Sequence, residues 1–393
     1  MRDGWRQVTL GELFEPSKTR LGEHDAEPPV FSISKHNGVM PAEEFFGKRV
    51  ASANLANYKT LSADAWVYST IHIDEGSIAR NNTGVDGVVS PMYTVMSWSS
   101  RRDDPRYLEY LLRSKEMLAA YADSSQGSIN RRRSLSWKAF STISIVLPSL
   151  NEQQRIVDLI AAVHHAIEAA EMEAVASFAA LERTRDLFIW HGTADRIHLG
   201  EVATIAGHLV DPSSASHSCL PHIGTERIES CTGDLLGVVS AAEDGVTSGK
   251  FLHEAGTIVY SKIRPNLRKV TIPSWRGLCS ADAYPVLPKS EGDVSFLRHL
   301  LVSRPFTREA VARSGRTKMP KINKTELMSI QVPAVRVEDQ TRIASVLDSM
   351  DQARVSARTT ADALGSLRSN LLSALLSGEH EIPASYDEFL ETA

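Results

Sequence analysis

The sequence predicts an α+β protein with two globular domains in tandem, each followed by one long helix, and with the two helices packed as an antiparallel coiled coil. Three observations predict this architecture. The chain repeats itself at an offset of about 190 residues. Each repeat begins with short β-rich runs separated by turn residues, and each closes with a long stretch free of proline. A duplicated unit of this kind implies approximate two-fold symmetry.

The repeat is carried by residues that match in the same order in both halves. The alternative to a true repeat is a similar composition that arose by convergence. The matches argue against it, because they mix glycine, proline, tyrosine and polar residues rather than leucine alone. Four of the matches are Leu10-Gly11-Glu12 with Leu199-Gly200-Glu201, Val67-Tyr68-Ser69 with Val259-Tyr260-Ser261, Ser90 and Tyr93 with Ser280 and Tyr284, and Gly127 with Gly315. The closing match sets Pro148, Glu152, Gln153, Arg155 and Ile156 against Pro333, Glu338, Gln340, Arg342 and Ile343, with a two-residue insertion.

The β-rich runs at 65–73 and 257–263 lie among Gly, Asn and Asp turns, which indicates mixed α+β domains. The stretches 152–188 and 338–376 carry apolar residues at alternating spacings of four and three, which predicts long helices. Arg354 and Arg368 interrupt the apolar seam of the second helix. Two separate surface helices are the alternative, but mutual packing covers both seams most economically.

These signals divide the chain into five segments. A length of 393 residues allows two or three domains, each large enough to bury a core. We expect globular domains at 1–150 and 193–336, helices at 151–192 and 337–378, and an acidic tail at 379–393.

Composition excludes several classes of protein. With 42% hydrophobic and 23% charged residues, the chain is neither wholly disordered nor collagen-like nor a membrane protein. The cysteines Cys219, Cys231 and Cys279 form no CxxC pair, so neither a disulfide framework nor a zinc cluster is supported. We see no signal peptide and no membrane-spanning run, and we expect a cytoplasmic location.

The positive charge is clustered although the net charge is −5. Basic residues gather at 260–280 and 303–326 in the second half, and at 131–133 in the first half, four residues after the matched Gly127. A solvated charged face would explain any single run. The matched placement in both halves favours DNA, because phosphates need clustered Lys and Arg, and base edges need Arg, Asn, Gln or Lys.

The candidate DNA-contacting residues combine these basic side chains with neighbouring polar ones. In the first half they are Lys35, Asn37, Arg80, Asn81, Asn82, Gln126, Ser128, Asn130, Arg131, Arg132 and Arg133. In the second half they are Lys262, Arg264, Asn266, Arg268, Lys269, Arg316, Thr317, Lys318, Lys321, Asn323 and Lys324.

The motifs of common enzymes are absent from the sequence, and we find no catalytic or metal site. The run from Gly245 to Lys250 is one residue short of a phosphate-binding loop and lacks the hydroxyl that binds magnesium. There is no GxGxxG, HExxH or GxSxG motif, and no Asn-Pro-Pro-aromatic run of the kind that amino-methyltransferases use. His164 and His165 are adjacent on a helix and cannot share one metal ion.

The sequence resembles the specificity subunits of type I restriction-modification systems over nearly its whole length. The resemblance rests on Trp5 to Leu13, on Gly127 with its basic loop, and on the helix-leading segments Pro148 to Ile156 and Pro333 to Ile343. In that family each globular domain is a target recognition domain and each long helix a spacer. The resemblance implies that each domain reads one half of a bipartite DNA target and that the helices set the gap.

The resemblance also implies the partners. A specificity subunit has no catalysis of its own. Two modification subunits dock on the spacer helices and methylate adenine with S-adenosylmethionine, and restriction subunits add translocation and cleavage driven by ATP with magnesium. The second signature departs from the family, which usually has Glu and Gln adjacent, where this chain has Glu338-Asp339-Gln340. Docking on the second helix is therefore less well supported than on the first.

Three alternatives stay open at this stage. A scaffold that assembles partners on the helical pair predicts no salt-dependent binding to duplex DNA. An enzyme with an unfamiliar site predicts turnover by the isolated chain. A specificity or scaffold protein of another phage-defence or DNA-modification complex predicts different partner subunits.

Overall fold

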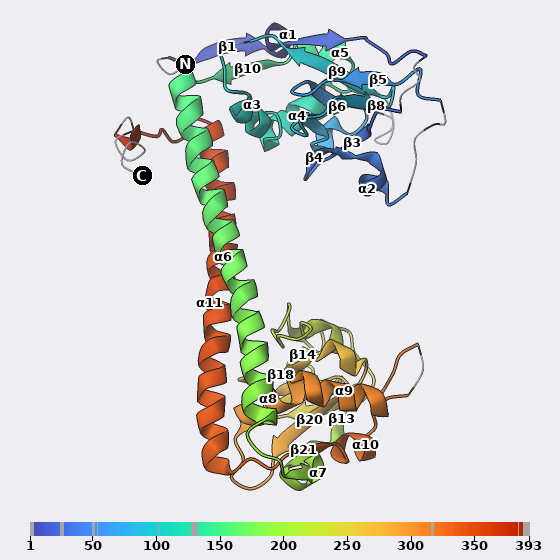
Figure 1. The fold of residues 1–393 in the computed structure, drawn as a ribbon, viewed down its shortest axis with the longest axis vertical. Helices are drawn as coiled ribbons and strands as arrows, with labels where there is room; N and C mark the ends of the chain where they lie inside the picture. Colours follow the sequence, from blue (N-terminus) through green and yellow to red (C-terminus); the bar gives the residue numbers. More distant parts are fainter. Residues whose placement is uncertain are drawn as a thin grey trace. The chain divides into compact units, whose positions relative to one another are not determined.

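The computed structural model describes residues 4–23, 27–48, 52, 54–100, 102–126, 133–315, 318–383 and 385–387. The chain forms two compact units (Figure 1), which are described separately. Unit 1 comprises Met1–Ile167 and Asp362–Ala393, and unit 2 comprises Glu168–Ala361. Each unit therefore contains one globular domain, part of the first long helix and part of the second.

Unit 1 is built on three sheets. Their strand orders are β2-β9-β6-β7, β4-β3-β8-β5 and β1-β10, and β3 and β8 form a parallel pair. The strands are β1 (Arg6–Thr9), β2 (Phe14–Ser17), β3 (Val30–Ser34), β4 (Gly38–Pro41), β5 (Lys59–Leu61), β6 (Trp66–Ser69), β7 (Ile78–Arg80), β8 (Gly87–Val89), β9 (Tyr93–Trp98) and β10 (Ser144–Leu147).

Unit 2 repeats this plan and adds one strand, β13. Its sheets run β12-β20-β17-β18, β13-β16-β19-β14-β15 and β11-β21, and β14 and β19 form the matching parallel pair. The strands are β11 (Arg196–His198), β12 (Ala203–Ile205), β13 (Leu209–Val210), β14 (Pro221–Ile223), β15 (Val239–Ser240), β16 (Lys250–His253), β17 (Ile258–Ser261), β18 (Val270–Thr271), β19 (Gly277–Cys279), β20 (Ala283–Pro288) and β21 (Gln331–Pro333).

Short helices connect and cover these sheets. In unit 1 they are α1 (Leu10–Leu13), α2 (Ala42–Phe46), η1 (Ile73–Glu75), α3 (Pro105–Leu111), α4 (Lys115–Ser124) and α5 (Trp137–Ser141). In unit 2 they are α7 (Leu199–Val202), η3 (Thr225–Arg227), η4 (Pro265–Leu267), α8 (Val294–Val302), α9 (Arg304–Arg313) and α10 (Lys324–Met328). The duplicated α+β fold predicted from the sequence is confirmed.

The first sequence match has a structural cause in α1 and α7. The Leu10 amide donates to the Ile143 carbonyl at 2.9 Å, and the Leu199 amide donates to the Ile330 carbonyl at 2.8 Å. A Cβ at Gly11 would lie 2.9 Å from Ser141, and one at Gly200 would lie 3.3 Å from Met328. Glycine is needed at position 11 and favoured at position 200, because the helix backbone approaches a second segment closely.

A second matched glycine, which the sequence comparison missed, begins β8 and β19. A Cβ at Gly87 would meet the Phe31 ring at 2.4 Å, and one at Gly277 would meet the Trp275 ring at 2.5 Å. In both units an aromatic ring therefore covers the sheet where the strand starts. The aromatic residue comes from strand β3 in unit 1 and from the bend before β19 in unit 2, which hides the match in the sequence.

The long helices α6 (Leu150–Trp190) and α11 (Val337–Leu376) have 41 and 40 residues. Within unit 1, the first turns of α6 lie beside the last turns of α11 (Figure 1), and Ile156 and Ile160 share a core with Leu371 and Leu375. Within unit 2, the end of α6 lies beside the start of α11, where Leu181 and Leu347 share a core. The packing is antiparallel in both units, as predicted. Among the helices of the described chain, none has the length and apolarity to cross a membrane.

The glutamine of the repeated signature joins each long helix to its domain. Gln153 is fully buried, accepts from the Asp104 amide at 2.8 Å and donates to the Pro148 carbonyl at 3.0 Å. Gln340 accepts from the Asp293 amide at 3.1 Å and donates to the Val335 carbonyl at 2.9 Å. Asp104 and Asp293 are the N-caps of α3 and α8. In both units the same two hydrogen bonds therefore join the long helix to the start of an equivalent short helix and to the segment before the long helix.

Two of the sequence matches are wrong by one residue. With Gln340 equivalent to Gln153, the counterpart of Glu152 is Asp339 rather than Glu338. In the sheets, Tyr68 pairs with Thr94 and Tyr260 pairs with Tyr284, so Tyr284 matches Thr94 and not Tyr93. Since side chains alternate along a strand, Tyr93 and Tyr284 lie on opposite faces of equivalent sheets.

Candidate DNA interface

The two basic segments of unit 2 meet on one surface although they lie far apart in the sequence. Ile263 and Lys321 form a β-bridge, and the Arg264 amide donates to the Pro320 carbonyl at 2.8 Å. The Ile322 amide donates to the Lys262 carbonyl at 3.0 Å. Backbone hydrogen bonds therefore join the turn after β17 to the segment before α10, and their cationic side chains become neighbours.

We call this region the basic surface of unit 2, defined by the six candidates Lys262, Arg264, Asn266, Lys318, Lys321 and Lys324. Lys262 lies over the Tyr284 ring, with its ammonium 5.1 Å from the ring centre. Lys321 donates to Asp282 at 3.0 Å, and Lys262 lies 4.0 Å from the same carboxylate. All of these side chains are exposed except Lys262, which is half-buried. Two ammonium groups share one carboxylate, so the surface keeps a positive excess.

The turn after β17 contains two arginines in the left-handed backbone region. Arg264 has a φ of 46° and Arg268 has a φ of 51°, which L-residues other than glycine rarely adopt. The turn η4 between them carries the exposed Asn266. The strained backbone directs Arg264 outward, whereas Arg268 forms an ion pair with Glu182 of α6.

Three predicted contacts of unit 2 have partners within the protein. Arg268 is engaged by Glu182, as described above, and joins the domain to the helix. Lys269 donates to the Thr225 carbonyl at 2.8 Å. Asn323 is the N-cap of α10 and accepts from the Glu326 amide at 2.9 Å. Each side chain has a protein partner that the sequence could not show, so the structure does not favour these three as DNA contacts.

In unit 1, four candidates are exposed at turns. Lys35 and Asn37 lie in the turn between β3 and β4, where the Asn37 amide donates to the Ser34 hydroxyl at 3.2 Å. Gln126 and Arg133 are exposed, and they flank the stretch whose Gly127 the sequence matches with Gly315. The candidates Ser128, Asn130, Arg131, Arg132, Arg316 and Thr317 lie outside the described residues.

Three candidates around β7 are bound within unit 1. Asn81 is fully buried and donates to the carbonyls of Ser62 and Val85 at 3.1 and 2.9 Å. Arg80 donates to Asp64 at 2.6 Å and lies 3.6 Å from Glu109, to which Asn82 also donates. Asn81 therefore cannot reach a ligand in this conformation, and the carboxylates beside Arg80 and Asn82 disfavour a phosphate there.

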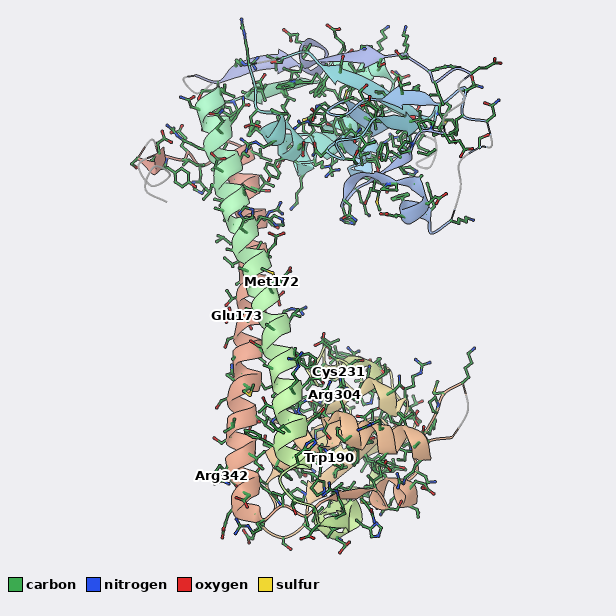
Figure 2. The ribbon with its side chains drawn as sticks, in the orientation of Figure 1. Met172, Glu173, Trp190, Cys231, Arg304 and Arg342 are labelled. Carbon is green, nitrogen blue, oxygen red and sulfur yellow. The ribbon has the colours of Figure 1, made fainter. Side chains whose placement is uncertain are left out.

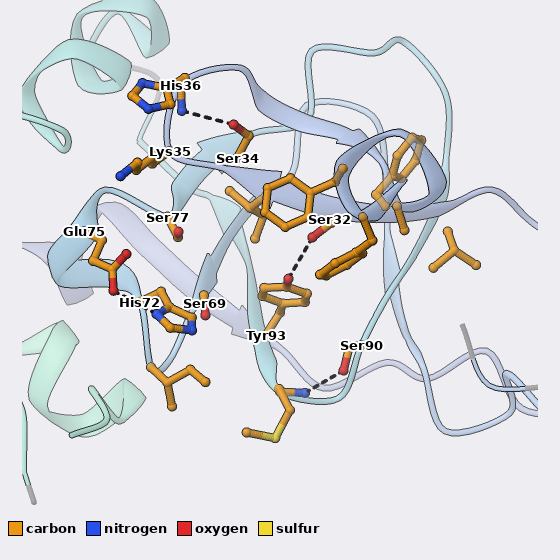
Figure 3. A pocket seen from close by; sticks show the side chains of 18 of the residues that line it. Ser32, Ser34, Lys35, His36, Ser69, His72, Glu75, Ser77, Ser90 and Tyr93 are labelled. Carbon is orange, nitrogen blue, oxygen red and sulfur yellow. Dashed lines mark hydrogen bonds and ion pairs between the residues drawn. The ribbon is translucent and has the colours of Figure 1, made fainter. Parts of the chain in front are cut away.

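A pocket of about 570 Å³ opens beside Lys35 in unit 1 (Figure 3). Its polar side includes Ser32 and Tyr93, whose hydroxyls lie 3.0 Å apart. Its apolar side includes Phe45 and Phe46, whose rings meet edge to face at 4.7 Å and are 42% and 47% exposed. Exposed aromatic rings beside hydroxyls can accept an apolar ligand group together with a hydrogen bond.

Sequence reasoning missed Phe45, Phe46 and Tyr284. The Phe-Phe pair is followed by Gly47 in a short segment, where nothing distinguishes an exposed aromatic pair from a core pair. Tyr284 was matched in the wrong register, which hid its place beneath Lys262. Within the described residues, no group of three or more His, Cys, Asp or Glu side chains is arranged to hold a metal ion.

No family model matches the sequence. A specificity subunit of the type I restriction enzyme EcoDI from Escherichia coli is 39% identical over 150 residues, which is 38% of this chain and 33% of the E. coli protein. The chain thus spans about a third of the length of the curated relative that it matches.

Solved structures are similar over nearly the whole chain and show the fold. A chain from a study of complex assembly and conformational transition of the type I restriction-modification system has a TM-score of 0.61 at 18% identity, covering 96% of this chain and 98% of that one. The HsdS subunit from Thermoanaerobacter tengcongensis has a TM-score of 0.53 at 17% identity over 97% and 98%. The S subunit from M. genitalium has a TM-score of 0.52 at 14% identity over 94% and 96%. With its duplicated domains and paired long helices, this chain has the fold of the specificity subunits of type I restriction-modification systems, and part of it is similar in sequence to one of them.

Proposed function

We propose that this chain is the sequence-specific DNA-recognition subunit of a type I restriction-modification complex, directing methylation and restriction subunits to a bipartite target. The observation that carries the proposal is the basic surface of unit 2, where backbone bonds join two cationic segments within a fold of this family. Clustered cations on a rigid framework are what phosphate neutralisation requires.

The chemistry of each unit suggests how DNA is read. The exposed Arg264, Lys318, Lys321 and Lys324 contact phosphates, while the exposed Asn266 reaches base edges in the major groove. In unit 1, Lys35, Asn37, Gln126 and Arg133 take the polar contacts. The exposed Phe45 and Phe46 offer an apolar surface to a thymine methyl group.

The chain performs no chemistry in this proposal. Two modification subunits supply adenine methylation from S-adenosylmethionine, and restriction subunits supply ATP- and magnesium-dependent translocation and cleavage. The target recognition domains are 1–150 and 193–336, the spacer helices are 151–192 and 337–378, and 379–393 is the tail. The complex acts in the cytoplasm, where chromosomal and invading DNA are accessible.

The test is detection of methylated adenines across the host genome, with and without this gene. The expected result is a bipartite motif, two short specific halves around a fixed gap, that disappears on deletion and returns on complementation. Persistence of every methylated motif after deletion argues against the proposal and favours a scaffold in another complex.

Binding measured on the chain purified with its modification subunits tests the basic surface directly. Arg264→Ala is expected to weaken duplex binding and to lower the slope of log affinity against log salt by about 1, since one phosphate contact contributes about 0.9. Lys115→Ala, an exposed cation on α4, is the matched control and leaves the slope unchanged. An unchanged slope in Arg264→Ala removes that residue from the interface.

A further inference from the structure

A groove of about 900 Å³ lies in unit 2 where the end of α6 meets the start of α11. Its apolar wall is made by Leu187, Phe188 and Val346, which are 56%, 40% and 42% exposed, and its rim carries Arg336 and Arg342. Figure 2 shows Arg342 on the side of α11 that faces away from the sheets of unit 2. The groove thus lies apart from the basic surface.

The equivalent place in unit 1 is filled by the chain's own C-terminal segment. The matched glutamines make Arg155 the counterpart of Arg342, and Leu375 the counterpart of Phe188. Leu375 is only 2% exposed and shares its core cluster with Ile382, which is 8% exposed. Equivalent positions are therefore covered in unit 1 and open in unit 2.

The segment in unit 1 is held by three side chains within six residues. Ile382 enters the core cluster, and Tyr386 packs against the same cluster. Asp387 accepts two hydrogen bonds from Arg155, one of them from Nε at 2.7 Å. These bonds also hold the pKa of Asp387 below its ordinary value. An aliphatic residue, a tyrosine and a carboxylate are thus the chemistry that fits this kind of groove.

Unit 2 cannot fill its groove in the same way. The chain that leaves α6 continues directly into β11, so His191, Gly192 and Asp195 line the groove rather than cover it. On the rim, Arg336 and Arg342 both bond to the single carboxylate of Asp339 at 2.8 Å. Arg155 likewise has an acidic neighbour, Glu152, and still binds Asp387. The rim can therefore accept a further carboxylate.

We propose that the groove of unit 2 binds an acidic, tyrosine-containing segment of a partner protein, in the manner in which Ile382, Tyr386 and Asp387 fill the groove of unit 1. A second copy of this chain is the less favourable occupant. Its segment would have to leave Arg155 and expose an equal groove there, so no contact is gained. The inference does not depend on DNA recognition, and a chain that failed the DNA tests could still pass this one.

The test uses a fluorescent peptide with the sequence of residues 377–387 and the full chain. We expect saturable binding that Arg342→Glu and Val346→Asp each weaken at least tenfold. A peptide in which Tyr386 is Ser and Asp387 is Lys is expected to bind at least tenfold more weakly. Lys318→Glu is the control, because an acidic peptide held only by general attraction to the basic surface would respond to it.

Three outcomes overturn the proposal. The first is an absence of saturable binding, and the second is binding that Arg342→Glu leaves unchanged. The third is binding that appears only when residues 379–393 are deleted, which assigns the peptide to the groove of unit 1. Light scattering on the chain alone separates the occupants. A dimer that forms with concentration and is lost in Arg342→Glu replaces the partner protein with a second copy.

Discussion

The turn between β6 and β7 in unit 1 and the turn between β17 and β18 in unit 2 occupy the same place in the fold. Each contains a short helix, η1 or η4, and each receives a backbone bond from a later segment, from Leu135 to Thr70 at 2.8 Å and from Ile322 to Lys262 at 3.0 Å. The backbone plan is therefore duplicated down to individual hydrogen bonds.

The side chains on these turns are not duplicated. The turn of unit 1 carries Asp74 and Glu75, whereas that of unit 2 carries Arg264, Arg268 and Lys269. Where unit 1 ends its helix with Gly76 in the left-handed region, unit 2 uses Arg268, whose ion pair with Glu182 ties the turn to α6. A shared framework with different surface chemistry agrees with our proposal that the two domains read different half-targets.

The junctions between domain and helix differ in the same way. In unit 2, Arg298 pairs with Asp351 at 2.9 Å, and Arg354 pairs with Asp234 at 2.9 Å and with Asp351 at 2.8 Å. The counterpart of Arg298 in unit 1 is Glu109, which instead accepts from Asn82 within the domain. Unit 2 holds its helices with charge, and unit 1 relies more on Gln153 and its apolar core.

The largest effect is expected at the shared glutamine. Gln153→Ala leaves the Asp104 amide, the Pro148 carbonyl and an Asp103 oxygen without their partner, and should destabilise unit 1 by about 3 kcal/mol. Gln340→Ala leaves two groups and should destabilise unit 2 by about 2 kcal/mol. Amide hydrogen exchange localises each loss. Equal losses in both units from either variant would show that the two junctions do not respond separately.

A smaller effect is expected from the charged junction. Arg354→Met removes the partner of Asp234 and one partner of Asp351, and should cost about 2 kcal/mol of unit 2 stability in urea unfolding. The counterpart of Arg354 on α6 is Ile167, an apolar residue on the same seam. If Arg354→Met is instead more stable than the parent, the apolar seam of unit 1 is the better solution and the ion pairs serve another purpose.

The smallest effect is a pH dependence confined to unit 2. His299 is fully buried, accepts from Arg185 through Nδ1 at 3.2 Å and contacts Asp348 through Nε2 at 2.9 Å, the pattern of a neutral imidazole. Burial lowers the pKa of His299 against the opposing effect of Asp348, and burial also lowers the pKa of Arg185 to about 10. Below about pH 6.5, His299 therefore binds a proton in the unfolded chain but stays neutral in the folded chain.

Unit 2 should accordingly lose about 1 kcal/mol between pH 7 and pH 5.5 through His299. The measurement compares the urea midpoint of the parent with that of His299→Gln, which cannot take up the proton. The variant should show a weaker pH dependence. Asp348 and Asp351 act at lower pH, because hydrogen bonds and cations overcome their burial and hold both pKa values below the ordinary range. Identical pH profiles for parent and variant would contradict the assignment of a neutral His299.

The sequence predicted the duplicated plan well because glycine, proline and glutamine mark places where the backbone leaves little choice. The helices expected at 152–188 and 338–376 run from Leu150 to Trp190 and from Val337 to Leu376. The register of the matches was less secure. Ser90 and Tyr93 suggested Tyr284 as a counterpart, but strand pairing sets Tyr284 against Thr94, and one residue reverses the face.

The candidate contacts were harder to predict because charge in a sequence does not reveal its partner. Arg80 meets Asp64 and Glu109, and Arg268 meets Glu182, a residue 86 positions away. Asn81 is of a residue type that often contacts bases, but its side-chain amide donates to two backbone carbonyls within the protein. Conversely, the β-bridge between Ile263 and Lys321 brings together the basic segments 260–280 and 303–326, whose proximity the sequence does not reveal.

The order of segments in the two units has a consequence for how the chain is made. Unit 2 is one continuous stretch, Glu168–Ala361, so every residue that it needs is present once position 361 has been synthesised. Unit 1 combines Met1–Ile167 with Asp362–Ala393, and the cluster around Ile156 and Ile160 includes Leu375 and Ile382. The domain synthesised first is therefore completed last. On the ribosome, the part of α6 that belongs to unit 1 lacks its partner helix until about 200 further residues have been synthesised, at a rate of roughly 5–20 residues per second.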